Sequence, residues 1–248
     1  MAVDLNCDLG EEAGEDERIL PLVSSVNVAC GFHAGDASTI RATVRLAARH
    51  GVAVGAHPSY PDRAGFGRAP MDRTPAQVRD DVVYQVAAVR AFCAAEGVPL
   101  VHVKPHGALY NAAAQDRALA TAIGEAVREV DPGLVVVCLA GSPMASVVRS
   151  LGLRCAEEAF ADRGYTPQGT LVPRGTPGAL LEDPAAVAER VSAMARERRV
   201  RSVTGAMVAV AADTICLHGD TPGAAALAAA IRARLAADGV EVRPMRRG

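Results

Sequence analysis

The sequence predicts an α/β fold in which about seven parallel strands alternate with helices and close into an irregular barrel. Three observations carry this prediction. Short apolar or alternating runs are separated by helical segments along all 248 residues, which is typical of parallel βαβ units. No change of composition marks a linker, so we expect one domain over residues 1–248. Polar residues recur near the carboxyl ends of the predicted strands. A barrel turns such residues inward from every strand, whereas an open sheet gathers them only beside one crevice.

The predicted strands lie at residues 3–9, 26–33, 52–57, 101–104, 134–139, 155–160 and 214–218, and 240–242 is a candidate for a last short one. In the first strand Asp4, Asn6 and Asp8 alternate with apolar residues, so the polar side chains share one face. Pro105 cannot continue a strand ladder, so the fourth strand is expected to end near Lys104. In a barrel these polar faces point inward and converge.

Helices are predicted between the strands, at residues 39–50, 75–96, 115–130, 142–150, 184–198 and 222–237. Their ends carry the expected signals: Ser38 or Asp36 can cap the first helix, and Thr74 opens the second, which Gly97 closes. Irregular loops are expected at 58–70 and 164–181, and the stretch 203–215 shows no clear pattern.

Composition excludes several classes of protein. A net charge of -2 and a pI near 6.3 provide no basic field for nucleic acid or for an anionic membrane surface. No apolar run reaches the ~18 residues of a membrane span, and the N-terminus does not resemble a signal peptide. Six dispersed cysteines form no Cys-x-x-Cys pair, which indicates reduced, buried thiols. We therefore expect a cytoplasmic protein that acts on a small molecule.

Lys104 is the first functional candidate because it is the only lysine in a chain with 26 Lys plus Arg. An ammonium group is more compact than a guanidinium group, and its pKa falls readily on burial. The alternative is a lysine that only snorkels at a strand end. His102 and His106 flank it, but Pro105 between them argues against a helix and therefore against the helical zinc motif of two histidines.

Five of the six histidines end or follow predicted strands, namely His33, His57, His102, His106 and His218. The sixth, His50, ends a helix, where its charge offsets the helix dipole. Two chemistries suit the five. One is a zinc or other divalent metal site formed by Asp8 and His57 with His102 or His106. The other is acid–base work without a metal, in which histidines move protons and Lys104 holds an anion.

Several charged residues outside the strands have two interpretations. Asp162, Arg163 and Arg174 can bind a substrate carboxylate, although exposed ion pairs explain them about as well. Asp36 and Asp220 each follow a glycine and can be ordinary turn residues that cap helices.

Long motifs then give the chain a family resemblance. They occupy residues 4–11, 27–36, 55–58, 65–68, 102–111, 160–163 and 213–220. Together they resemble the LamB/YcsF family, in order and over nearly the whole chain. The departures, such as Ser59 in place of a more usual glycine and Val28 in place of isoleucine, leave the polar positions intact.

The resemblance implies a 5-oxoprolinase, which opens 5-oxo-L-proline to L-glutamate and converts ATP to ADP and phosphate. It also implies partner subunits B and C and an irregular β/α barrel similar to those of deacetylases and glycoside hydrolases. A five-membered lactam is a stable amide, and phosphorylation of its carbonyl oxygen would make it electrophilic toward water. The sequence has no Gly-x-x-x-x-Gly-Lys-[Ser/Thr] loop, so ATP must be held another way or by a partner. Two alternatives stay open: a stand-alone metal-dependent deacetylase or amidohydrolase, and a non-catalytic subunit that binds the lactam.

Site residues follow from the polar positions and the resemblance. The expected catalytic residues are Asp8, His33, His57, His102, Lys104 and His106. Lys104 is assigned to the carbonyl oxygen or a phosphoryl group, and His102 or His106 to acid–base work. A metal, if present, is assigned to Asp8, His57 and His102. The expected substrate contacts are Asn6, Glu11, Asn27, Asp36, Tyr110, Asp162, Arg163, His218 and Asp220.

Overall fold

Seven parallel strands form a closed ring at the centre of the protein. The computed structural model describes residues 1–247. The ring consists of β1 (Ala2–Leu9), β2 (Ser25–Ala29), β3 (Ala53–His57), β4 (Leu100–Val103), β5 (Val135–Leu139), β6 (Arg154–Phe160) and β9 (Thr214–His218). Each strand pairs in parallel with the next, and β9 pairs with both β6 and β1, which closes the ring. The predicted seven-stranded barrel is therefore confirmed.

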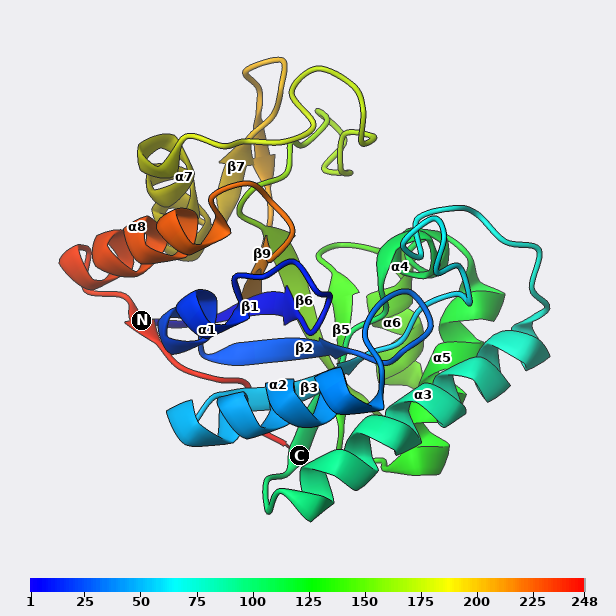
Figure 1. Ribbon diagram of the computed structural model, residues 1–248. Helices are drawn as coiled ribbons and strands as arrows, with labels where there is room; N and C mark the ends of the chain where they lie inside the picture. The colour runs from blue at the N-terminus through cyan, green and yellow to red at the C-terminus, as the bar shows by residue number, and fades with distance from the viewer. Residues whose placement is uncertain (248) are drawn as a thin grey trace.

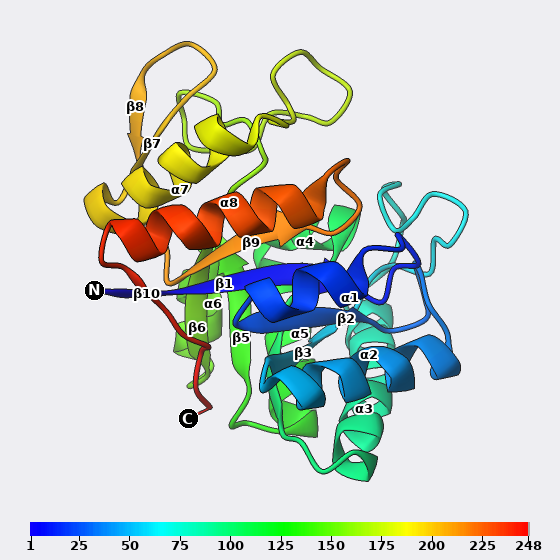
Figure 2. The ribbon, with the colours of Figure 1, turned by 60° about the vertical axis from the view of Figure 1, so that its left-hand side comes forward.

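Helices cover the outside of this ring, as Figures 1 and 2 show. The long ones are α2 (Ala37–His50), α3 (Pro75–Ala95), α5 (Arg117–Val130), α6 (Pro143–Ser150), α7 (Pro184–Glu197) and α8 (Ala224–Ala237). Shorter pieces are α1 (Asp16–Ile19), the 3-10 turn η1 (Leu20–Leu22) and α4 (Gly107–Ala113). The main hydrophobic core lies between strands and helices and includes the outward-facing Leu5 and Cys7 of β1. Among residues 1–247, no helix combines the length and the apolar character that crossing a membrane requires.

Local capping explains where the helices begin and end. The Asp36 side chain accepts a hydrogen bond from the Thr39 backbone N–H and starts α2, and Gly51 ends it in the left-handed conformation. Thr74 and Gln77 form a reciprocal capping box that starts α3. These contacts confirm the helix boundaries expected from the sequence to within two residues.

The structure differs from the sequence prediction in three segments. The second strand ends at Ala29 rather than at residue 33, because Gly31 has φ 93° and its N–H turns to the Ala34 carbonyl. Residues 107–113 form α4 where only a loop was expected, since the glycine at the first position concealed the helix. The unparsed stretch 203–215 holds β8 (Met207–Ala209), which pairs antiparallel with β7 (Arg199–Arg201). β10 (Glu241–Val242) adds to the start of β1 as expected.

The inside of the ring is polar on one side and apolar on the other. On β5 and β6 the inward side chains Val135, Val137 and Ala156 form a small apolar cluster against Met245. On β1 and β2 the inward side chains are carboxylates and amides, which are nearly inaccessible to solvent. Buried polar groups of this kind are tolerated only when they bond to one another, and this requirement shapes the site.

Candidate active site

Two buried clusters of polar side chains lie at the carboxyl ends of the barrel strands. We call the first the lysine network; it consists of Asp8, Lys104, Glu158 and Cys216 together with Asn6 and Asn27. We call the second the histidine cluster; it consists of Glu11, His33, His57 and His106. The strands of a parallel barrel end at one face, which brings these residues together from distant parts of the sequence.

Lys104 is the centre of the lysine network. Its Nζ lies 2.8 Å from Asp8 Oδ1, 2.8 Å from Cys216 Sγ and 3.3 Å from Glu158 Oε1. Burial by itself would lower the pKa of Lys104, but the charges of its neighbours outweigh burial and raise that pKa well above its ordinary value. Lys104 is therefore an ammonium ion that donates hydrogen bonds to Asp8 and Cys216 and forms an ion pair with Glu158.

Two amides extend the network toward the centre of the barrel. The Asn27 side chain donates to Asp8 Oδ1 and to Asn6 Oδ1, both at 2.7 Å. Asn6 in turn donates to Glu158 Oε1 at 3.0 Å and to Thr214 Oγ1 at 2.6 Å. Every side-chain donor of these two amides thus has an acceptor. The hydrogen bond from Asn27 holds the Asp8 carboxylate in place.

His102 lies inside the barrel, next to Asn27. Its Nε2 is 2.7 Å from Asn27 Oδ1, and its Nδ1 is buried without a partner among the described residues. The ring occupies the space above Gly55, where a Cβ atom would lie 2.1 Å from Nε2. Glycine is therefore required at that position of β3, and His102 is screened from the mouth of the barrel.

The histidine cluster lies above the network. Glu11 Oε1 is 2.9 Å from His33 Nε2, 3.5 Å from His106 Nδ1 and 3.9 Å from His57 Nε2. His57 Nε2 is also 2.9 Å from His106 Nδ1 and 3.3 Å from Asp8 Oδ2. Asp8 is therefore shared: its Oδ1 belongs to the lysine network and its Oδ2 faces the cluster.

Burial and neighbouring charge set the protonation of these groups. Burial raises the pKa of Asp8, but His57 and Lys104 outweigh it and hold that pKa well below the usual value, so Asp8 is ionised. Burial and the charge of Asp8 raise the pKa of Glu11 well above its usual value. Burial lowers the pKa of His33 to about 2 and that of His106 well below 6.5, so both imidazoles are neutral.

A cavity of about 980 Å³ opens above both clusters. Its floor includes Asp8, His57, Lys104 and His106, and its walls include Arg68, Tyr110, Phe160, Arg163, Arg174 and His218. The guanidinium group of Arg163 donates to the carbonyls of Val172 and Ala179, so it supports the loop. Arg174 makes no hydrogen bond or ion pair to any described residue.

His218 lies on one wall of this cavity. Its ring stacks on Phe160 with a centroid distance of 5.4 Å, and its Nδ1 is 3.0 Å from an Asp162 oxygen. Thr221 donates to the other oxygen of Asp162 at 2.6 Å. This buried pair fixes one face of the imidazole toward the cavity.

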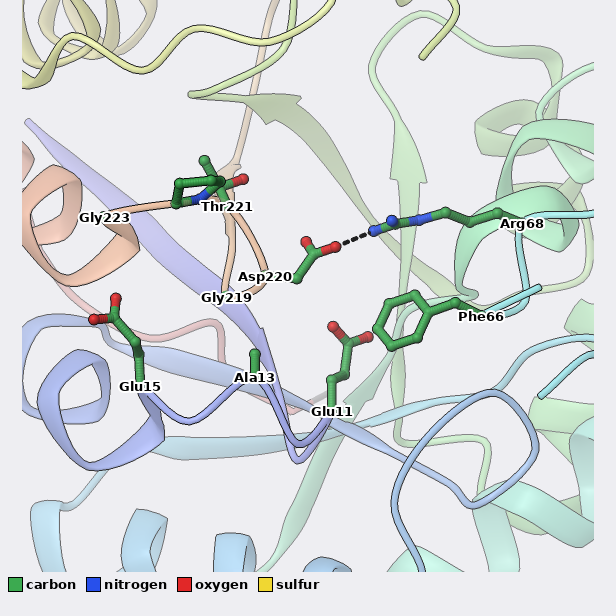
Figure 3. A pocket seen from close by; sticks show the side chains of 10 residues that line it. Glu11, Ala13, Glu15, Phe66, Arg68, Gly219, Asp220, Thr221 and Gly223 are labelled. Atoms are coloured by element: carbon green, nitrogen blue, oxygen red, sulfur yellow. Dashed lines mark hydrogen bonds and ion pairs between the residues drawn. The ribbon is translucent and has the colours of Figure 1, made fainter. Parts of the chain in front are cut away.

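A second cavity of about 490 Å³ lies on the other side of Glu11. Figure 3 shows the Glu11 carboxylate beside the Phe66 ring, and the ion pair between Arg68 and Asp220 across the cavity. Arg68 Nη2 lies 2.5 Å from Asp220 Oδ2. Glu11 thus faces solvent-accessible space on one side and the imidazoles on the other.

Most of the residues predicted for the site are brought together, and two are not. Asp36 is exposed and serves as the helix cap described above, away from both cavities. His102 does not join Asp8 and His57 as a third potential ligand; in the described chain His106, Glu11 and His33 are the neighbours of His57 instead. Asn6 and Asn27 contact Asp8 and its neighbours rather than the cavity.

The sequence interpretation missed Glu158, Cys216, Arg68 and Ser59. Glu158 carried a signal, since a strand with two adjacent glutamates must turn one of them inward. Ser59 Oγ contacts His33 Nδ1 at 2.9 Å, and Cys216 shares a face of β9 with His218. Nothing in the local sequence distinguishes Ser59 or Arg68 from ordinary loop residues.

A parallel β/α barrel with ionised and neutral titratable groups converging at the carboxyl ends of its strands is the arrangement of a barrel enzyme. Comparison with known proteins identifies the family to which this barrel belongs. The chain belongs to the LamB/YcsF family, whose model matches residues 3–248.

Relatives in this family share about half of their residues with the chain. The 5-oxoprolinase A subunit of Syntrophobacter fumaroxidans is 51% identical over 247 residues, covering 98% of each chain. That of Pyrococcus furiosus is 50% identical over 250 residues, covering 99% of this chain and 98% of the relative. The crystal structure of a lactam utilization protein from Thermus thermophilus is 50% identical and superposes with a TM-score of 0.93 over 99% of this chain and 100% of that one.

A remote structure shares the fold alone. A putative cellobiose-phosphate cleavage protein from Enterococcus faecalis is 11% identical, with a TM-score of 0.55 over 97% of this chain and 96% of that one. The barrel architecture therefore extends beyond the family.

Proposed function

We propose that this chain is the A subunit of a 5-oxoprolinase, which opens 5-oxo-L-proline to L-glutamate with conversion of ATP to ADP and phosphate. The observation that carries the proposal is the identity of about half of all residues, over nearly the full length of both chains, to proteins named as A subunits of 5-oxoprolinase. The name implies further subunits, and we infer that subunits B and C complete the enzyme. ATP is the co-substrate, and a cytoplasmic location follows from its supply.

The larger cavity suits the substrate. A volume of about 980 Å³ accommodates a lactam and leaves room for a phosphoryl group. 5-Oxo-L-proline carries a carboxylate, and Arg174 lines this space with a guanidinium group that forms no hydrogen bond or ion pair with any described residue. We propose that Arg174 binds the substrate carboxylate, and that the side chains of Tyr110 and His218 contact the five-membered ring of the lactam.

The floor of the cavity supplies the polar chemistry. Asp8 is ionised, and its Oδ1 is held by Lys104 and Asn27 while Oδ2 faces the imidazoles. We propose that Asp8 positions the attacking water and accepts its proton. The ammonium of Lys104 keeps Asp8 ionised and places one cation beneath the developing oxyanion or phosphoryl group. Of the two histidines considered for acid–base work, His106 reaches the cavity and His102 does not.

A second function is favoured by one specific observation. The histidine cluster is a group of potential metal ligands, as a metal-dependent deacetylase or amidohydrolase would require. Such an enzyme would act alone and without ATP. A non-catalytic subunit that binds the lactam would show neither activity.

The test measures L-glutamate released from 5-oxo-L-proline by this chain alone and then with subunits B and C, with and without ATP. We expect release only with ATP and the complete complex. In that complex Asp8→Asn should reduce turnover by at least about 100-fold, which is a typical contribution of a positioned base. Asp116→Asn is the matched control, because Asp116 caps α5 at the surface. Release by the chain alone without ATP would support the deacetylase or amidohydrolase, and full activity of Asp8→Asn would refute the role of Asp8.

A further inference from the structure

The hydrogen-bond partners of His57 and His106 determine where their protons lie. His57 Nδ1 is 2.7 Å from the Lys104 carbonyl oxygen, and His106 Nε2 is 2.8 Å from the Phe66 carbonyl oxygen. A carbonyl oxygen only accepts, so both of these nitrogens carry the hydrogen. When His57 and His106 are neutral, the opposite nitrogens, His57 Nε2 and His106 Nδ1, therefore carry lone pairs.

These two lone-pair nitrogens face each other at 2.9 Å. While both rings are neutral, neither nitrogen can donate to the other, and the nearest remaining atoms are carboxyl oxygens. Asp8 Oδ2 is 3.3 Å from His57 Nε2, and Glu11 Oε1 is 3.9 Å from it and 3.5 Å from His106 Nδ1. All four side chains are buried. Lone pairs that converge in this way call for a cation between them, and that cation is either a metal ion or a proton.

We propose that this space binds one divalent transition-metal ion, with His57 Nε2, His106 Nδ1 and Glu11 Oε1 as its protein ligands. Tetrahedral bonds of about 2.0–2.1 Å separate ligand atoms by roughly 3.3 Å, and the three distances of the cluster lie on both sides of that value. Imidazole ligands favour zinc or a related ion over magnesium or calcium, which prefer oxygen.

His33 serves this site as the group that orients Glu11. Its Nε2 is 2.9 Å from Glu11 Oε1, and its ring stacks on that of His106 with a centroid distance of 3.9 Å and an angle of 4° between planes. An ion bonded in the plane of His106 lies outside the parallel plane of His33, so the two rings do not share it. Metal-bound carboxylates are commonly held by such a second hydrogen bond, and His33 Nε2 donates it when the Ser59 hydroxyl donates to His33 Nδ1.

The backbone conformation at residues 66 and 67 fixes the orientation of the His106 ring. Phe66 has φ 55° and Gly67 φ 65°, and this left-handed pair aims the Phe66 carbonyl at His106 Nε2. A Cβ atom on Gly67 would lie 2.8 Å from His106 Cδ2 and 2.9 Å from His33 Cβ. A strained turn that fixes the proton on one ring nitrogen leaves the other free to bind a metal.

The site has access to solvent and room for a further ligand. Glu11 borders the smaller cavity of Figure 3, and His57 and His106 border the larger one. Three protein ligands and an open position are typical of catalytic zinc sites. The other potential group of ligands, Asp8, Cys216 and His218, does not need an ion, because the ammonium of Lys104 already contacts Asp8 and Cys216.

The test is metal binding by the purified chain, so it does not depend on the reaction proposed above. Chelator-treated protein is titrated with Co²⁺, and bound ion is measured by elemental analysis and by the visible absorption of tetrahedral Co²⁺. We expect one ion per chain, displaced by Zn²⁺. His106→Ala and Glu11→Gln should each weaken Co²⁺ binding at least about tenfold, and His33→Gln by about 10–100-fold, the usual effect of losing an outer hydrogen bond.

His50→Ala is the matched control, because His50 ends α2 at the surface and should leave Co²⁺ binding unchanged. Circular dichroism of each variant separates loss of a ligand from loss of the fold. The wild-type chain itself decides the proposal if a variant does not fold. The absence of a stoichiometric Co²⁺ spectrum, or unchanged binding in both folded ligand variants, would overturn it in favour of a proton shared by His57 and His106.

Discussion

The lysine network and the histidine cluster lie next to each other, are both buried and share Asp8, yet their hydrogen bonding is opposite in kind. In the lysine network donors meet acceptors: the ammonium of Lys104 has three partners and both amides have all their N–H groups engaged, so that every donor has an acceptor and only one acceptor, Glu158 Oε2, lacks a partner among the described residues. In the histidine cluster His33 bonds to Glu11, but the lone-pair nitrogens of neutral His57 and His106 face each other and two carboxyl groups. A network that is complete within the chain can hold residues in place, whereas an incomplete one needs a ligand.

This difference assigns the two clusters different tasks. The network keeps Asp8 ionised and fixed, and it connects β1, β2, β6, β9 and the residue after β4 across the barrel. The cluster and Arg174 present unused binding capacity to the cavities. Substitutions in the network should therefore reduce stability, and substitutions of the incomplete groups should reduce binding with little effect on stability.

The largest effect is expected for Lys104→Met. This change leaves Asp8 and Glu158 buried without their cation, and loss of one partner from a buried ion pair typically costs about 3–5 kcal/mol. Urea denaturation of the purified chain measures the change in free energy of unfolding. Lys104→Arg keeps the charge but not the compact shape, so it should retain more stability and still lose turnover in the complete enzyme. Wild-type turnover of Lys104→Arg would contradict the role of Lys104.

A smaller loss is expected for Gly55→Ala, because the added methyl group collides with the His102 ring. Overpacking of a filled interior typically costs about 1–3 kcal/mol. The measurement is a double-mutant cycle from denaturation of Gly55→Ala, His102→Ala and the double variant. If the collision causes the loss, Gly55→Ala costs less in the His102→Ala background. Strict additivity of the two changes would show that His102 does not fill this space.

Asp162→Asn tests the hydrogen-bonded pair of Asp162 and His218 at the cavity wall. Burial raises the pKa of Asp162, but His218 and the hydrogen bond from Thr221 outweigh it, so the pKa is lowered overall. A lowered pKa means that the carboxylate stabilises the fold above its unfolded pKa, and that this stability is lost as pH falls through the acid range. The variant should lose about 1.5 kcal/mol at neutral pH, the value of a hydrogen bond to a charged group.

The pH dependence separates this explanation from a loss of packing. The difference in free energy of unfolding between wild type and Asp162→Asn should be constant between pH 7 and about 5 and should then shrink as pH falls to about 3, because the unfolded chain then binds a proton that the folded carboxylate still resists. A difference that stayed constant over the whole of that range would mean that the ionised carboxylate contributes no stability.

The sequence predicted the barrel and its polar mouth because both follow from local patterns. The alternation of polar and apolar residues on β1 predicted that Asn6 and Asp8 face the opposite side from the apolar core residues. Their positions at or just after strand ends identified His57 and His106 as site candidates. The closed ring then follows from parallel βαβ units. Capping residues such as Asp36 and Thr74 fixed the helix starts, since a cap acts within four residues of chain.

The details of the site could not be predicted because they depend on contacts between distant segments. His102 can lie inside the barrel only because Gly55 has no side chain there. The Phe66 carbonyl accepts a hydrogen bond from His106 Nε2 and so leaves the lone pair on His106 Nδ1. A buried lysine suggested a lowered pKa, but Glu158, 54 positions later in the chain (158 minus 104), helps to raise it. Proton positions and pKa values are properties of the assembled site.

The smallest effect on stability, and a large one on binding, is expected for Arg174→Ala. The guanidinium group makes no bond to any described residue, so the free energy of unfolding should change by less than about 0.5 kcal/mol. A bond to the substrate carboxylate would contribute about 1.5–3 kcal/mol, so KM for 5-oxo-L-proline should rise roughly ten- to hundredfold in the complete enzyme. Arg232→Ala on α8, away from both cavities, is the matched control. If Arg174→Ala instead lowered stability and left KM unchanged, a group without internal partners would be supporting the fold, and the contrast between complete and incomplete polar groups would fail at its simplest case.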